Sequence, residues 1–296
     1  MTGYLEILAI FIADLFTCLR YLPIILLLAC LLSCNSTKHV TLTVPGTTAS
    51  RMTGSDFFRI AAAWNWKRRD SMAVQQILSG NMPSFLRKFT ALHASLADST
   101  GTMHRAVLYV SPDYLAVGTN EDWARVPLTP MAAQRIADSF HCFLPTRKIA
   151  DLVYEQALIK CEPVPLFAFR DSSVTMWQHH LIIEGQRKNK KGLIAGIKKD
   201  VVISGMSKAK PDRVAIYGWH RADGKPIQPL YTGHVNWYVD YSHGARLVYA
   251  YLWVDGKKNA VRRCAETSRL PFIYLRRSRL PAIPVFVLKR RKVYFQ

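Results

Sequence analysis

The chain lacks the residue patterns that define most metal and disulfide frameworks. Of its six cysteines, only Cys142, Cys161 and Cys264 follow Cys34, and no two cysteines are spaced as CxxC. A structural zinc knuckle is therefore not expected, and the odd number after Cys34 leaves at least one thiol unpaired or allows one disulfide. The HExxH metalloprotease motif and internal repeats are also absent.

Acidic residues are scarce as well. Forty Lys and Arg residues stand against twenty Asp and Glu residues, which gives a net charge of +20 over 296 residues. The excess is concentrated beyond Gly256, where twelve basic residues accompany the single acidic residue Glu266. The part before it is only moderately basic, so we predict no nucleic-acid partner. Half of the residues are hydrophobic, which excludes a disordered chain.

The N-terminal residues 4–33 are nearly all apolar. From Arg20 onward the pattern is a basic residue, an apolar run over 21–32 and a small residue before Cys34, as in a bacterial lipoprotein signal peptide. We predict an export segment over 1–34 with lipidation at Cys34, and Cys30 as an alternative. The whole apolar stretch could instead be an uncleaved membrane anchor. Both interpretations predict a domain outside the cytoplasm, either anchored in the bacterial cell envelope or secreted.

Three further segments follow this export segment. Residues 35–52 are rich in Thr, Ser and Gly and are predicted to be a linker. Helical and strand-like patterns alternate over 53–256 without a strict βαβ period, which predicts one compact α+β domain with short mixed or antiparallel strands and several helices. Residues 257–296 form a basic tail whose prolines and arginine pairs do not resemble a folded element, so we hypothesise that it is an aberrant C-terminus.

Local patterns predict the elements of this domain. A helix start at Thr53 is followed by a helical pattern to about Leu78. Three more helices are predicted: one that ends at Phe140, one over 147–158 and one over 173–188. The predicted strands cover 104–110, 114–119, 123–128, 193–197 and 200–204.

The stretch 214–254 holds most of the candidate functional residues. Two strand-like runs, VAIYGW and ARLVYAYLWV, enclose a segment that contains Gly and Pro, which is typical of a functional loop held by rigid strands. Its polar candidates are His220, His234, Asp240, Ser242 and His243.

These residue types indicate acid–base chemistry. His234 or His243 is predicted to be a general base, with Asp240 fixing its tautomer and His220 as a further candidate. Ser242 and His243 are adjacent, so in extended backbone they would point to opposite faces and would not act on each other. Ser242 and Lys199 are therefore predicted to bind polar substrate groups, and Trp219, Trp237 and Tyr238 to form the walls.

Three alternatives remain open for these residues. Cys142 precedes a helix start and could be a nucleophile that works with a downstream histidine, although a buried structural cysteine is the simpler interpretation. The spacing H-x13-H-x5-D-x2-H could hold zinc or iron. The same side chains could instead satisfy buried backbone polar groups.

Several strings, among them VSPDYLAVGTNEDWARVPLTPMAAQRIADSFHCFLPTRKI, YGWHRADGKPIQPLYTGH and YVDYSHGARLV, resemble a family of exported bacterial proteins of unknown function. The resemblance covers about 53–257 and ends where the basic tail begins. It implies one intact domain and brings no activity or catalytic residues.

We therefore expect an envelope-associated lipoprotein that hydrolyses a cell-envelope polymer such as peptidoglycan with a His/Asp site. The alternatives are a non-catalytic protein that binds glycan or peptide, and a His/Asp metalloenzyme. The expected partners are an envelope polymer or small ligand and the membrane, and the sequence identifies no cofactor.

Overall fold

A computed structural model describes residues 40–44, 51–97, 101–206 and 210–263, together with strands β16 and β17. All of them belong to the compact unit Val40–Gln296. The predicted export segment, including Cys30 and Cys34, lies outside the described residues. In the described part, no helix has both the length and the apolar character needed to cross a membrane.

The helices begin where a side chain can cap them. They are α2 (Gly54–Ala61), α3 (Trp66–Leu78), η1 (Ser84–Arg87), α4 (Pro130–Ser139), α5 (Arg147–Gln156) and α6 (Ser173–Arg187). Every α-helix follows a Thr, Asn or Ser whose side chain accepts an N–H from the first turn. The single helix predicted from Thr53 to Leu78 is wrong, because Asn65 has extended backbone and caps α3 as a new helix.

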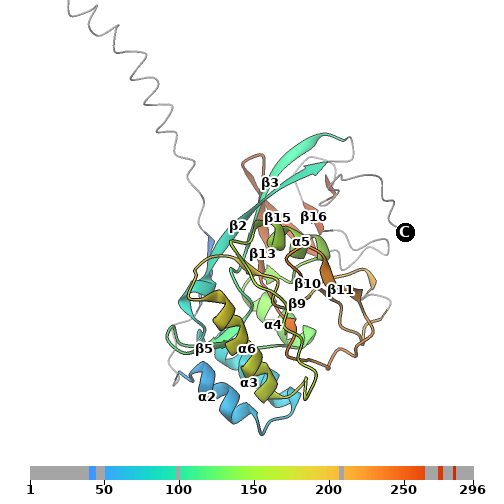
Figure 1. Cartoon of the computed structure of the whole chain (residues 1–296). Helices are drawn as coiled ribbons and strands as arrows, with labels where there is room; N and C mark the ends of the chain where they lie inside the picture. Colours follow the sequence, from blue (N-terminus) through green and yellow to red (C-terminus); the bar gives the residue numbers. More distant parts are fainter. Residues whose placement is uncertain are drawn as a thin grey trace, which may run out of the picture. The chain divides into compact units, whose positions relative to one another are not determined.

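The larger sheet is antiparallel. Its order is β1 (Val40–Thr41), β2 (Lys88–Ala97), β3 (Met103–Val110), β14 (Tyr251–Val254), β15 (Lys257–Arg263), β16 (Ile273–Leu275) and β17 (Ile283–Pro284). Strand β13 (Val248–Tyr249) pairs with β3 and with β6 (Cys142–Phe143). Helices α2, α3 and α6 lie together, at the opposite end from the long β2–β3 hairpin (Figure 1).

This sheet corrects both predicted domain boundaries. Val40 and Thr41, in the predicted linker, pair with β2. The start of the predicted basic tail is β15, which pairs with β14 from Val254↔Lys257 to Tyr251↔Ala260. The connection is a two-residue turn in which Asp255 and Gly256 both have positive φ, 48° and 76°, as a tight hairpin requires.

A second, mixed sheet carries the candidate site. Its order is β11 (Pro226–Tyr231), β10 (Ile216–His220), β9 (Lys199–Val201) and β12 (His243–Gly244). Strands β9 and β10 are antiparallel, whereas β12 runs parallel to β9 with His243 opposite Lys199. Two short ribbons, β4 (Ala116–Gly118) with β5 (Trp123–Arg125) and β7 (Ile159–Lys160) with β8 (Ile194–Ala195), complete the described strands. The described part is thus α+β, as predicted.

Candidate functional site

The segment before β12 is a turn built around Asp240. One carboxylate oxygen of this buried residue accepts the backbone N–H of Ser242 at 2.8 Å and also its hydroxyl. The N–H of His243 donates to the carbonyl of Asp240 at 3.1 Å. The backbone is therefore not extended here, which contradicts the prediction of opposite faces. Ser242 is fully buried and fixes this turn, and the substrate-binding role predicted for it stays a prediction.

Asp240 is held as a carboxylate. Its second oxygen accepts from Arg170 Nη2 at 3.0 Å. Burial alone would raise the pKa of Asp240, but His243, which is protonated at the low pH where Asp240 titrates, holds it well below its usual range together with Lys199 and the hydrogen bonds from Ser242. The predicted orienting role for a histidine is not supported, because the nearest Asp240–His243 distance, Oδ1 to Nε2, is 3.9 Å and too long for a hydrogen bond.

His243 is the most unusual side chain of this group. It is fully buried, and neither ring nitrogen has a hydrogen-bond partner in the part of the chain that the structure describes. Burial lowers its pKa to about 4, against the opposing charge of Asp240. The imidazole is therefore neutral at pH 7.

His234 forms the outer side of the same group. It is half-buried, and its ring centroid lies 6.2 Å from that of His243, 4.7 Å from that of Tyr238 and 5.1 Å from that of Tyr231. Burial also lowers the pKa of His234. We call His234, Tyr238, Asp240 and His243, with Arg170, the histidine cluster.

A buried lysine lies behind this cluster and was not predicted from sequence. Lys198 donates to the carbonyl of Tyr241, and its Nζ lies 3.3 Å from His179 Nδ1. Burial lowers the pKa of Lys198 to about 7 and that of His179 to about 2. No local pattern identifies these two residues, because they meet across different elements.

His220 belongs to a different polar group. Its Nε2 lies 3.1 Å from Asp151 Oδ1, its ring stacks on Tyr154 at 4.6 Å, and the hydroxyl of Tyr217 donates to the same Asp151 oxygen at 2.6 Å. These contacts join β10 to α5. His220 therefore lies in a polar group separate from His234, Asp240 and His243, and its catalytic role stays a prediction.

Two predicted binding residues are packed in the interior. Trp219 is buried, with a positive φ of 57°, and the Nζ of buried Lys199 lies 5.2 Å from its ring centroid. Neither side chain is available to a ligand from solvent. The roles predicted for Trp219 as a wall and for Lys199 as a binder of polar substrate groups therefore stay predictions, which a ligand could meet only if these buried side chains became accessible.

Cys142 is a buried structural cysteine, as the simpler interpretation predicts. Its thiol donates to the carbonyl of Phe140 at 3.3 Å, and burial raises its pKa to about 12. A thiol that does not ionise is a poor nucleophile, so the structure contradicts the nucleophile interpretation.

The predicted metal set does not converge. Over the described ranges, no three His, Cys, Asp or Glu side chains are placed so that they could hold a metal ion.

Trp237 and Tyr238 line a cavity, and their predicted role as walls of a substrate site stays a prediction. The cavity volume is about 320 Å³, and the cavity lies between the α2–α3 connection, the start of α6 and residues 237–239. Trp66 and Trp237 stack with ring centroids 6.4 Å apart, and Trp237 is 50% exposed. Tyr238 belongs to both this cavity and the histidine cluster. We call it the aromatic cavity; its lining residues are Ala62, Trp64, Asn65, Trp66, Arg69, Asp171, Ser172, Ser173, Val174, Trp237, Tyr238 and Val239.

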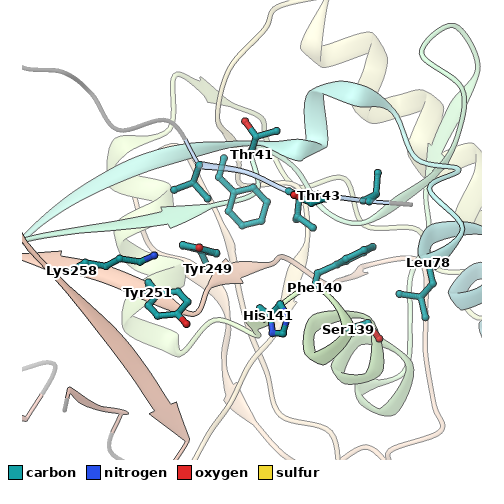
Figure 2. A pocket seen from close by; sticks show the side chains of 13 residues that line it. Thr41, Thr43, Leu78, Ser139, Phe140, His141, Tyr249, Tyr251 and Lys258 are labelled. Atoms are coloured by element: carbon teal, nitrogen blue, oxygen red, sulfur yellow. The ribbon is translucent and has the colours of Figure 1, made fainter. Parts of the chain in front are cut away.

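A larger cavity of about 820 Å³ involves none of the predicted site residues. It lies between β1, the end of α4 and strands β13 to β15, and Figure 2 shows Phe140, His141, Tyr249 and Tyr251 among its lining side chains.

Comparison of the chain with protein-family models, with curated proteins and with solved structures gave no significant match. The aromatic cavity and the histidine cluster, which share Tyr238, are the two neighbouring candidates for a functional site.

Proposed function

We propose that this protein is an exported, envelope-associated protein that binds the glycan or peptide of a cell-envelope polymer, such as peptidoglycan, in the aromatic cavity. The observation that carries the proposal is the stacked pair Trp66 and Trp237 in the cavity wall, of which Trp237 is 50% exposed. Indole rings offer large, rigid apolar faces with a polar N–H, which suits the apolar faces and hydroxyls of sugar rings. The cavity volume falls in the usual range for ligand sites.

The predicted export segment supports the same proposal. Lipidation at Cys34 would hold the domain at a membrane surface without a spanning helix. A domain held there meets envelope polymers directly, and the moderate basicity of its folded part suits polymers that carry acidic groups.

Binding is favoured over hydrolysis by the state of the predicted catalytic groups. The thiol of Cys142, whose pKa burial raises to about 12, is protonated at neutral pH. His243, with a pKa of about 4, is a weak base at neutral pH.

One observation favours a second candidate, hydrolysis by water that His234 activates. Buried polar atoms are nearly always hydrogen-bonded, yet both ring nitrogens of His243, directly behind His234, have no partner among the described residues. Such unsatisfied groups are common at functional sites.

Co-sedimentation with purified peptidoglycan tests both candidates. We expect Trp237→Ala to weaken binding about tenfold, as for a typical interface anchor. Leu158→Ala, which removes an 80%-exposed apolar side chain away from the cavity, should bind like the wild type. Equal binding by Trp237→Ala and wild type would contradict the proposal. Soluble fragments released by the wild type, and lost in His234→Gln, would favour the hydrolase.

A further inference from the structure

Arg69 is a buried arginine that forms no close ion pair with any described residue. It is 2% exposed, and none of the ion pairs of the described residues includes it. Its Nη1 donates to the carbonyl of Asp171 at 3.3 Å, whereas Nε and Nη2 have no partner there. A buried charge is stable only when it is paired and hydrogen-bonded, so Arg69 has unused capacity to bind an anion.

The neighbouring acidic residues do not use this capacity. Asp70, next along α3, directs one carboxylate oxygen to the backbone N–H and hydroxyl of Thr129 at the start of α4. Asp171 is exposed to solvent and offers Arg69 its backbone carbonyl. Both carboxylates act on Arg69 only through their charge.

Two helix N-termini meet in the wall beside Arg69. Asn65 and Trp66 are the cap and first residue of α3, Ser172 and Ser173 are those of α6, and all four line the aromatic cavity. The first backbone N–H groups of a helix have no partner within the helix, and the helix dipole there favours negative charge. Arg69 and both helix starts therefore favour an anion in the same cavity.

We infer that the aromatic cavity binds a ligand with an anionic group, carboxylate or phosphate, on Arg69 and a ring against Trp66 and Trp237. The planar fork of an arginine can hold two oxygens of such a group at once. This inference deepens the proposed function and rests on it, because it names the acidic sugar units of an envelope polymer as the ligand class.

The test is a titration of the full-length chain with each sugar. Calorimetry and the change in tryptophan fluorescence measure the binding. The probes are N-acetylmuramic acid, its neutral counterpart N-acetylglucosamine, which lacks the lactyl carboxylate, and N-acetylglucosamine 1-phosphate. We expect at least one anionic sugar to bind about 10- to 100-fold more tightly than the neutral sugar, as for hydrogen bonds to a buried charge. Tighter binding of N-acetylmuramic acid would identify carboxylate as the preferred anionic group, and tighter binding of N-acetylglucosamine 1-phosphate would identify phosphate.

Three variants test the role of Arg69. Arg69→Met should abolish the preference for the anionic sugar and leave neutral-sugar affinity within about twofold. Arg69→Lys keeps the positive charge but not the planar guanidinium, so it should retain part of the preference for the anionic sugar. This variant replaces Arg69→Met in the test if Arg69→Met does not fold. Lys67→Met removes an exposed charge from the same helix turn and should retain the full preference.

Equal affinity for charged and neutral sugars, or a preference that persists in Arg69→Met, would overturn the inference. If peptidoglycan binds but Arg69→Met does not weaken it, the inference fails and the proposed function stands. If the anionic sugars bind through Arg69 but the protein does not sediment with the polymer, the proposed function fails, whereas the anion site in the aromatic cavity stands.

Discussion

Burial determines how the histidines behave at the scale of single residues. His243 is fully enclosed with Asp240 at 3.9 Å, and its neighbours Lys199, His234 and Lys198 oppose its protonation. His234, only half-buried, is the member of the pair that solvent and ligands can reach.

We predict that His243 titrates with a pKa of about 4 in the folded protein, against about 6.5 in the unfolded chain. Because the folded pKa is the lower one, protonation favours unfolding. The stabilising contribution is complete above pH 6.5 and is lost as the pH falls through 4. Histidine NMR titration, assigned with His243→Gln, measures the midpoint. Between pH 6.5 and 4 the variant should lose less unfolding free energy than the wild type; a midpoint near 6.5 would contradict this account.

At the scale of elements, close backbone approach positions the helices that form the aromatic cavity. Gly54, the first residue of α2, donates its N–H to Asp122 at 3.0 Å, and a Cβ there would overlap the backbone of Trp123 in β5. Gly185, within α6, has open space where a Cβ would lie. The same substitution should therefore have opposite effects at these two positions.

We predict that Gly54→Ala lowers the free energy of unfolding by about 1–3 kcal/mol, because the backbone must shift to accept the methyl group. Gly185→Ala should raise it by about 0.5–1 kcal/mol, since alanine loses less conformational entropy in a helix. Urea denaturation of both variants measures the difference. Equal effects of the same sign would show that α2 does not pack on β5 as described.

Sequence patterns predicted the local features of these elements well. The helices starting at Arg147 and Ser173 end within two residues of their predicted limits, because a capping residue and helical spacing are local signals. The start of the predicted tail is β15, and its pairing with β14 is a contact between strands that the composition of the tail does not indicate. The local signal for this pairing is the Asp255–Gly256 turn between the two strands.

At the scale of the whole molecule, the histidine cluster and the aromatic cavity are each formed by segments that are distant in sequence. His234, Asp240 and His243 were predicted together because they lie within ten residues of one another. Arg69 on α3 and Arg170 before α6 were missed, since each reaches the site only through tertiary packing and no spacing pattern connects them. His220, Ser242 and Trp219 lie close to these residues in sequence, but the structure buries their side chains, which sequence proximity alone does not predict.

The most direct test of the central claim is amide hydrogen exchange of the full-length chain with and without soluble peptidoglycan fragments. Ligand in the aromatic cavity should slow exchange at 62–66, 171–174 and 237–239, which form its wall. The larger cavity of Figure 2 provides the internal comparison, and its segments 139–141 and 249–251 should be unchanged. Protection confined to those segments, or none at all, would contradict the claim that this protein binds envelope polymer in the aromatic cavity.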